Sequence, residues 1–231
     1  CSSDLKLWVH ESRRVFKDRL VSAKDESRFT DILVRTAKKH FSETIGEEEL
    51  DEIFAPQTML VFSTFATQTM SELPPYLAAK GSDSLHKVLA QRLAEYNETH
   101  RIMDLVLFDT AMRHITRITR ILECPRGNAL LIGVGGSGKQ SLCRLAAFIC
   151  EMGVIQLAVK SNYGVADLKE NLKDLFRSAG VKPGMPVVFL LTDSQIVNEK
   201  FLVFVNDMLS SAHIPDLFSP DELDALFGSL R

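Results

Sequence analysis

The sequence predicts an α/β fold in which helices flank a parallel sheet, preceded by a small helical region. Over residues 5–54, apolar side chains recur among charged ones at helical spacing. From residue 128 onward, apolar runs typical of buried strands alternate with amphipathic stretches typical of helices. A glycine-rich turn that contains a lysine joins the first of these runs to the stretch that follows it. The two patterns together indicate a helical region followed by an α/β region.

The helical region comes first. About three packed helices are expected over residues 5–54, because no glycine interrupts the pattern before Gly46. The pattern ends around Ala55 and Pro56. We therefore predict one domain over residues 1–54 and a second over residues 55–231.

A connecting region follows. Residues 59–65 form a short apolar run that is predicted to be extended. Pro74 and Pro75 then interrupt the chain, because proline removes a backbone donor and fixes φ. Beyond them, helices are predicted over residues 84–97 and 101–122.

The α/β region is expected to alternate strand and helix throughout. Its predicted elements are strand 129–132, helix 141–150, strand 154–159, helix 165–179, strand 186–192 and helix 196–210. Parallel strands need a crossover connection between them, and helices supply it. This order therefore predicts a parallel sheet with helices on both faces.

Composition limits the classes of partner. The chain has 231 residues with a formal net charge of −3, so no attraction to nucleic acid or to a membrane surface is expected. No apolar run approaches the roughly 20 residues that span a bilayer, and the N-terminus lacks the pattern of a signal peptide. We predict a protein of the cytoplasm with no nucleic-acid and no membrane partner.

The glycine-rich turn matches the phosphate-loop pattern G-x-x-x-x-G-K. Its residues are Gly133, Val134, Gly135, Gly136, Ser137, Gly138, Lys139, Gln140 and Ser141. Glycines allow successive backbone N–H groups to point at phosphate oxygens from the positive end of a helix. Lys139 would then reach the β- and γ-phosphates. The alternative is an inert turn, but the predicted strand before it and helix after it favour a nucleotide-phosphate site.

The position that usually binds Mg²⁺ departs from this pattern. A Ser or Thr hydroxyl is expected directly after the lysine, whereas Gln140 stands there and the hydroxyl comes one residue later at Ser141. The metal ligand is therefore either Gln140 or Ser141. Mg²⁺ demands nearly octahedral geometry, so the sequence predicts that the metal is weakly held or absent.

A second strand carries the acidic part of the candidate site. The apolar run over residues 186–192 leads into Thr192, Asp193 and Ser194, where ATP-hydrolysing enzymes of this class usually have Asp-Glu. If Asp193 takes the place of the metal-linked Asp, Ser194 replaces the catalytic Glu. If Asp193 takes the place of the Glu, Thr192 replaces the metal-linked Asp. Either alignment lacks one group that hydrolysis needs.

On these sequence motifs, the chain resembles an axonemal dynein heavy chain over nearly all of its length. The similar segments are the phosphate loop with Lys139-Gln140-Ser141, Phe189-Leu190-Leu191-Thr192-Asp193-Ser194-Gln195-Ile196, Ile214-Pro215-Asp216-Leu217-Phe218, and Leu7-Trp8-Val9-His10-Glu11. The resemblance implies a P-loop NTPase of the AAA+ class. It identifies residues 1–54 as the helical lid of the third AAA+ module. Residues 55–231 then form a large part of the fourth.

The resemblance also implies a cellular context. Such a chain is part of a ciliary microtubule motor of the axonemal cytoskeleton, and its partners are neighbouring AAA+ modules of the same heavy chain and other dynein subunits. Microtubules are reached only through a stalk that is absent from this chain. The cofactor is ATP or ADP, and Val106 and Leu107 match the segment that contacts adenine. The alternative for these two residues is an apolar stripe on a long helix.

Two functions remain open at this point. One is a nucleotide-binding module that hydrolyses little and helps to hold the ring together. The other is a hydrolytically active regulatory module of the motor. Each lost carboxylate or metal ligand commonly lowers the rate about a hundredfold, so the changes at Gln140 and beside Asp193 favour binding with little hydrolysis.

Overall fold

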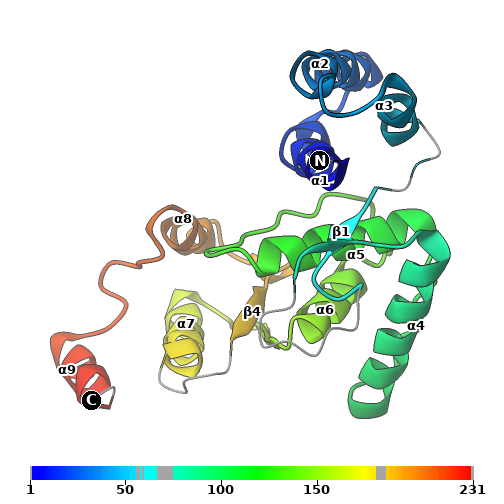
Figure 1. The fold of residues 1–231 in the computed structure, drawn as a ribbon. Coiled ribbons are helices and arrows are strands. Elements are labelled where there is room, and N and C mark those ends of the chain that lie inside the picture. Colours follow the sequence, from blue (N-terminus) through cyan, green and yellow to red (C-terminus); the bar gives the residue numbers. More distant parts are fainter. Residues whose placement is uncertain (1, 56–57, 59, 67–74, 181–185, 230–231) are drawn as a thin grey trace. The chain divides into compact units, whose positions relative to one another are not determined.

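The computed structural model describes residues 2–55, 58, 60–66, 75–180 and 186–229. Pro56 and Pro74, named above as breaks, lie outside these ranges, as does residue 59 of the predicted extended run. The chain divides into two compact units, Cys1–Arg120 and Ile121–Arg231 (Figure 1). Each unit is described by itself.

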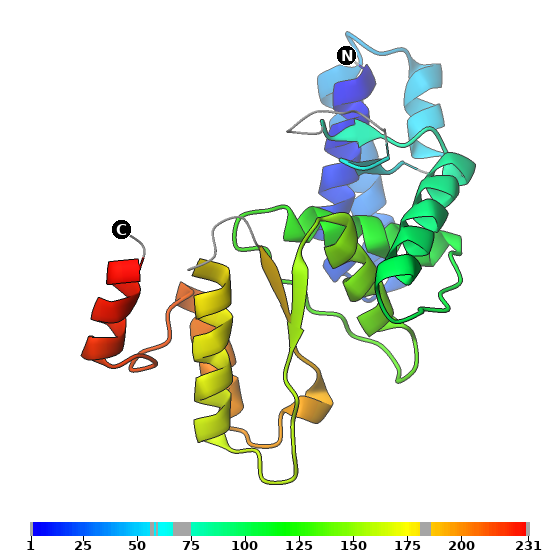
Figure 2. The same ribbon diagram turned by 90° about the horizontal axis from the view of Figure 1, so that it is seen from below.

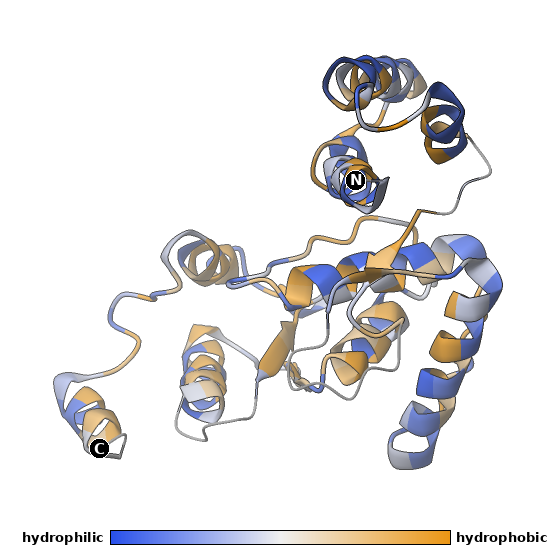
Figure 3. Ribbon diagram, viewed as in Figure 1, coloured by the Kyte–Doolittle hydropathy of each residue, from blue (hydrophilic) through white to orange (hydrophobic). Residues whose placement is uncertain are grey.

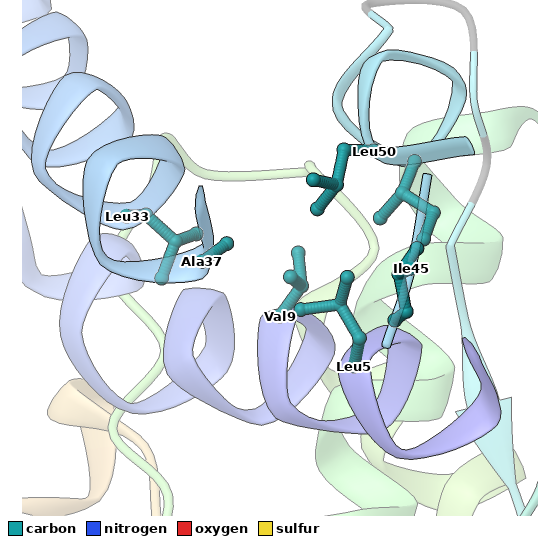
Figure 4. Close-up of a cluster of buried hydrophobic side chains, with 7 residues drawn as sticks. Leu5, Val9, Leu33, Ala37, Ile45 and Leu50 are labelled. Carbon is teal, nitrogen blue, oxygen red and sulfur yellow. The ribbon is translucent and has the colours of Figure 1, made fainter. Parts of the chain in front are cut away.

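The first unit begins with three helices, as predicted. They are α1 (Ser2–Phe16), α2 (Ala23–Phe41) and α3 (Glu47–Phe54), with a 3-10 turn at Lys17–Arg19 after the first. Helix α2 contacts both α1 and α3. Figure 4 shows the apolar cluster that they share, which consists of Leu5, Val9, Leu33, Ala37, Ile45, Leu50 and Ile53. Burying these side chains stabilises the three helices as one body.

A short hairpin and two helices complete the first unit. Strand β1 (Phe62–Ser63) pairs antiparallel with β2 (Leu77–Ala78), and helices α4 (Ser82–Thr99) and α5 (Asp109–Leu122) follow. The extended run predicted before Pro74 is confirmed over Phe62–Ser63, and the helix predicted at 84–97 is confirmed with two further residues at each end.

The helix predicted over 101–122 is wrong in its first part, since α5 begins only at Asp109. The side chain of Asn97 explains the difference. Its Oδ1 accepts from the backbone N–H of Met103 at 2.8 Å, and its Nδ2 donates to the carbonyl of Met103 at 3.2 Å. Both backbone groups of Met103 are thereby held by a side chain instead of a helical ladder.

A polar cluster joins α1 to α5 and to Tyr76, the residue before β2, within the first unit. Arg14 donates to Glu11, with Nη2 2.8 Å from Oε2, and Arg120 lies 3.7 Å from the same carboxylate. The Tyr76 hydroxyl lies 2.8 Å from His10 Nε2 and 3.1 Å from Glu11 Oε1, and the Arg120 guanidinium stacks over the Tyr76 ring at 4.1 Å. Residues on both sides of position 54 thus belong to one compact unit.

The electrostatics of this cluster follow from its half-buried position. Burial by itself raises the pKa of Glu11, but the hydrogen bond and charge of Arg14, the charge of Arg120 and the hydrogen bond from Tyr76 lower it overall. Burial lowers the pKa of His10, whose Nδ1 donates to the carbonyl of Leu60 at 3.2 Å. Glu11 therefore carries the negative charge that balances two arginines.

The second unit is built on two parallel strands. Strand β3 (Gly153–Gln156) pairs with β4 (Val187–Leu190) in the register Gly153↔Val187 to Gln156↔Leu190. Helix α6 (Lys139–Ile149) contacts both strands, and α7 (Val165–Gly180) contacts β4. Figures 1 and 2 show α6 and α7 on opposite sides of this strand pair. The prediction of a parallel sheet flanked by helices is confirmed.

The remaining elements follow β4. A 3-10 turn at Asp193–Gln195 precedes α8 (Phe201–Ser211), so the helix predicted from residue 196 begins five residues later, and α9 (Pro220–Ser229) was not predicted. The apolar faces of β3, β4, α7 and α8, orange in Figure 3, supply a common core. Its buried members are Leu157, Leu168, Leu172, Leu175, Phe201, Ile214 and Leu217.

The buried strand predicted at 129–132 is wrong. These residues form no strand, and Leu130 and Ile132 are 86% and 88% exposed. A strand needs a neighbour that takes its N–H and C=O groups. In the described part of the second unit, β4 is paired with β3 and no strand is paired with residues 129–132.

Helix α9 is fixed to α7 through Glu222. Lys173 Nζ donates to Glu222 Oε1 at 2.9 Å, and Arg177 Nη2 donates to it at 3.4 Å. The other oxygen, Oε2, accepts from the backbone N–H of Ser219 at 2.8 Å, while the Ser219 hydroxyl accepts from the N–H of Glu222 at 3.3 Å. This is a reciprocal cap at the first turn of α9. Phe218, beside it, packs edge-on against Phe176.

These contacts predict a pH-dependent stability. The hydrogen bonds from Lys173 and from the backbone of Ser219 lower the pKa of Glu222 from its ordinary value to about 2. Ionised Glu222 therefore stabilises the fold fully above about pH 5, and this contribution is lost as the pH falls from about 5 towards 2. Glu222→Gln should be less stable than the wild type at pH 7, and the gap should shrink below pH 4.5. Urea unfolding followed by circular dichroism measures it.

The matched control is Glu170→Gln, since Glu170 also contacts Lys173 but is 65% exposed. It should change the free energy of unfolding little at any pH. A gap between wild type and Glu222→Gln that stays constant from pH 7 to pH 3 would contradict the assignment.

Candidate functional site

The glycine-rich loop lies directly before α6. Gly136 and Gly138 both have φ of 75°, a left-handed conformation that favours glycine. Gly138 caps the helix, and its carbonyl accepts from the N–H of Leu142 at 2.9 Å. Among the described residues, the N–H groups of Gly135, Gly136 and Gly138 show no hydrogen bond to a protein acceptor. A row of available N–H donors at the positive end of a helix suits an anion.

Lys139 is the first residue of α6, and its ammonium group turns back over the loop. Nζ donates to the carbonyls of Gly133 at 2.8 Å and Val134 at 2.7 Å, and to the Ser137 hydroxyl at 3.1 Å. All three N–H bonds of the ammonium group are thus directed at the loop. The loop therefore encloses a fixed positive charge beside its free N–H donors, an arrangement that fits a phosphate group.

Gln140 is tied to the end of the neighbouring strand. Gln156, the last residue of β3, directs Nε2 at Gln140 Oε1 from 3.5 Å, the outer limit of a hydrogen bond. Its Oε1 accepts from Nη2 of Arg144. Gln140 and Arg144 lie four residues apart and so share one face of α6. Ser141, the other predicted metal ligand, is half-buried on the same first turn.

The residues at the metal position are a poor set for Mg²⁺. The ion is usually bound by one or two carboxylates together with hydroxyl and phosphate oxygens. Here Gln140 offers an amide oxygen that faces Gln156, and Asp193 is the only carboxylate at the end of β4. The described residues hold no group of three or more His, Cys, Asp or Glu side chains that could bind a metal.

The turn after β4 is shaped by a residue that the sequence analysis did not single out. Gln195 is buried, and its Oε1 accepts from the backbone N–H of Thr192 at 2.9 Å and from the Thr192 hydroxyl at 3.1 Å. Its Nε2 donates to the carbonyl of Leu157, just past β3, at 2.5 Å. Gln195 therefore fixes the Thr192–Asp193 turn to the end of β3 and leaves Asp193 exposed. Its signal was the Thr-x-x-Gln spacing of a capping box.

Val106 and Leu107 lie in the first unit, in the non-helical stretch before α5. Val106 is 71% exposed and Leu107 is half-buried. The stripe of a long helix, which was the alternative for these residues, is wrong because the helix starts after them. The phosphate loop and Asp193 both belong to the second unit.

Two family models match this chain. One, described as the P-loop containing dynein motor region D4, matches residues 103–231, and one described as an AAA+ lid domain matches residues 2–52. The chain is 48% identical over 228 residues to the flagellar outer arm dynein beta chain of Chlamydomonas reinhardtii. The chain belongs to the axonemal dynein heavy chain family. Its fold is accordingly that of a P-loop AAA+ domain with a lid.

Other dynein relatives are similar over the same length. The ciliary dynein beta chain of Tripneustes gratilla is 43% identical over 226 residues, and dynein axonemal heavy chain 9 of Homo sapiens is 43% identical over 227. Each match covers 98% of this chain and 5% of the relative's length. The family belongs to the axoneme of cilia and flagella, and its P-loop domain implies nucleotide binding. None of the described helices has the length and apolar character to cross a membrane.

The role of Gln195 in this dynein domain can be measured as stability. Gln195→Met keeps the length of the side chain but leaves the Leu157 carbonyl and the Thr192 N–H without their partner. Unsatisfied buried groups cost about 1–3 kcal/mol each, so the free energy of unfolding should fall by at least about 1 kcal/mol. Gln91→Met, on the exposed face of α4, should change it by less than about 0.5 kcal/mol. Equal effects of the two changes in urea unfolding would show that Gln195 does not anchor the turn.

Proposed function

We propose that this chain forms the nucleotide-binding part of an AAA+ module in an axonemal dynein motor, and that it binds ATP or ADP with little hydrolysis. The observation that carries the proposal is the loop of Gly133–Gly138. The N–H groups of its glycines Gly135, Gly136 and Gly138 show no described acceptor, and Lys139 lies folded against the loop at the start of α6. In this role Lys139 and the loop N–H groups bind the phosphates, and Val106 and Leu107 contact adenine.

Low hydrolysis is supported by the two departures in the site. Gln140 replaces a hydroxyl ligand, and Asp193 is a single carboxylate where turnover needs two acidic groups. Each such loss raises the barrier by about 3 kcal/mol, which corresponds to about a hundredfold in rate. Mg²⁺ would have Gln140 or Ser141 as its ligand, and we propose that it contributes little to binding.

The proposed modular origin divides the chain near residue 54. Residues 1–54 are the helical lid of the preceding AAA+ module and residues 55–231 belong to the next, in agreement with separate matches to residues 2–52 and 103–231. The partners are then neighbouring modules of the same heavy chain and other dynein subunits. Microtubules would be contacted by a part of the motor that is not in this chain.

Nucleotide binding should depend on Lys139. Lys139→Ala removes the charge that would be shared between the loop carbonyls and a phosphate. Charge-assisted hydrogen bonds contribute about 1.5–3 kcal/mol, so the affinity for a fluorescent ATP analogue should fall about tenfold to a hundredfold. The measurement is a fluorescence titration of the 231-residue chain.

The control for this titration is Lys87→Ala, which removes an exposed lysine from α4 and should leave the affinity unchanged. An unaltered affinity in Lys139→Ala would refute the phosphate site. If Lys139→Ala also loses the circular dichroism spectrum of the folded chain, the titration is repeated with Lys139→Met. That variant removes the charge but keeps the aliphatic part of the side chain.

Hydrolysis should be close to background in the unaltered site. The assay is phosphate release by a dynein motor region that contains this chain and whose other phosphate-loop lysines are replaced by alanine. The triple change Gln140→Thr, Thr192→Asp, Asp193→Glu restores the hydroxyl and both acidic groups, so turnover that depends on Mg²⁺ should rise about a hundredfold or more. Robust turnover before the change would instead support the regulatory ATPase.

A further inference from the structure

The face of α6 that carries Gln140 holds an unbalanced positive charge. Arg144 lies four residues after Gln140, and its guanidinium donates to the uncharged side chain of Gln156. Within the described residues Arg144 forms no ion pair with a carboxylate. A guanidinium fixed in this way is available to an anion.

Gln156 determines where both of its neighbours point. One carboxamide accepts from Arg144 through Oε1 and faces Gln140 Oε1 through Nε2. Because a carboxamide offers one acceptor oxygen and one donor nitrogen, it can hold a cation and an amide oxygen at the same time. Gln156 is the last residue of β3, so this arrangement is fixed to the sheet on which α6 packs.

The contacts of Gln140 and Arg144 with Gln156 determine whether this site suits Mg²⁺. The Gln140 amide oxygen faces Nε2 of Gln156 at 3.5 Å, a contact that competes with metal ligation, and a guanidinium on the same helix face repels a divalent cation. The same guanidinium attracts phosphate, whose charge Mg²⁺ would otherwise offset. The residues therefore do not fit a Mg²⁺ site but do fit an anion that carries no metal.

We propose that Arg144, positioned by Gln156, makes this a site for a nucleoside di- or triphosphate bound without Mg²⁺. The inference rests on the proposed nucleotide-binding function. It adds that the bound nucleotide carries no Mg²⁺ and keeps the full negative charge of its phosphates. Arg144 takes over the neutralisation of phosphate charge that a metal ion supplies elsewhere, and Gln156 is a positioning residue that acts through Arg144 and Gln140.

The test is a titration of the 231-residue chain with a fluorescent ADP analogue, once with EDTA and once with Mg²⁺ in excess. Because excess Mg²⁺ complexes most of the free nucleotide, the wild type should bind at least as tightly in EDTA as with Mg²⁺. Arg144→Gln should bind about tenfold more weakly in EDTA and less than threefold more weakly with Mg²⁺, because the metal replaces the lost charge. Gln156→Ala should shift the ratio of the two affinities in the same direction.

Arg92→Gln is the matched control, since Arg92 is an exposed arginine on α4 that pairs with Glu95. It should leave both affinities unchanged. A purely structural role for Arg144 would weaken binding equally in EDTA and in Mg²⁺, and that result would overturn the inference.

The outcomes separate this inference from the proposed function. Wild-type binding that is more than tenfold tighter with Mg²⁺ would overturn the metal-free site while the nucleotide-binding function stands. Absence of saturable binding in both conditions would overturn both.

Discussion

The parallel pairing of β3 with β4 is the interaction on which the candidate site depends. It brings the carboxyl ends of both strands to one edge of the sheet, where Gln156 ends β3 and Thr192 follows β4. Helix α6 packs against the same two strands, so the phosphate loop before it is carried by the sheet. Gln195 bonds across the two strand ends and keeps the turn that presents Asp193 in place. The chemistry of the site thus rests on a rigid strand pair.

Lys139 has two roles in the phosphate loop, since it holds the loop in shape and would also bind a phosphate. Its ammonium group is satisfied by two carbonyls and a hydroxyl of the loop, which holds the glycine-rich segment in shape. A phosphate would compete for the same three N–H bonds, but it would also engage the N–H donors of Gly135, Gly136 and Gly138. Binding therefore exchanges neutral acceptors for charged ones, and the net gain depends on how strongly the phosphate charge is neutralised nearby.

Charge neutralisation also stabilises the polar cluster of the first unit. Glu11 balances Arg14 and Arg120, while Tyr76 lies between the carboxylate and His10. These charges are half-buried, so water cannot fully solvate them. Removing one partner would leave the remaining charges without compensation and would destabilise the fold. This explains why residues before and after position 54 form one compact unit, although the family models divide the chain into a lid and a motor region.

The local elements that the sequence predicted correctly mostly carry a strong pattern of their own. The three N-terminal helices, α6 and α7 have apolar side chains at helical spacing, and the two paired strands lie in short apolar runs. Such a pattern specifies an element wherever a hydrophobic face can be buried. Helix α9 was not predicted because it is short and has no long apolar stripe. Its first turn is instead fixed by the reciprocal cap of Ser219 and Glu222.

Other features were decided by side-chain hydrogen bonds and strand pairing that a periodic pattern does not show. Residues 102–108 leave the helix because Asn97 takes both backbone groups of Met103, and Leu130 and Ile132 stay exposed because no described strand pairs with them. The phosphate-loop residues and Asp193 could be read from motifs, since their chemistry depends on residue type and spacing. Gln156 and Arg144 could not be assigned from spacing, and the Thr-x-x-Gln spacing of Gln195 indicates a cap but not its bond to Leu157. Their hydrogen bonds join segments that only the packing of α6 and the pairing of β3 with β4 bring together.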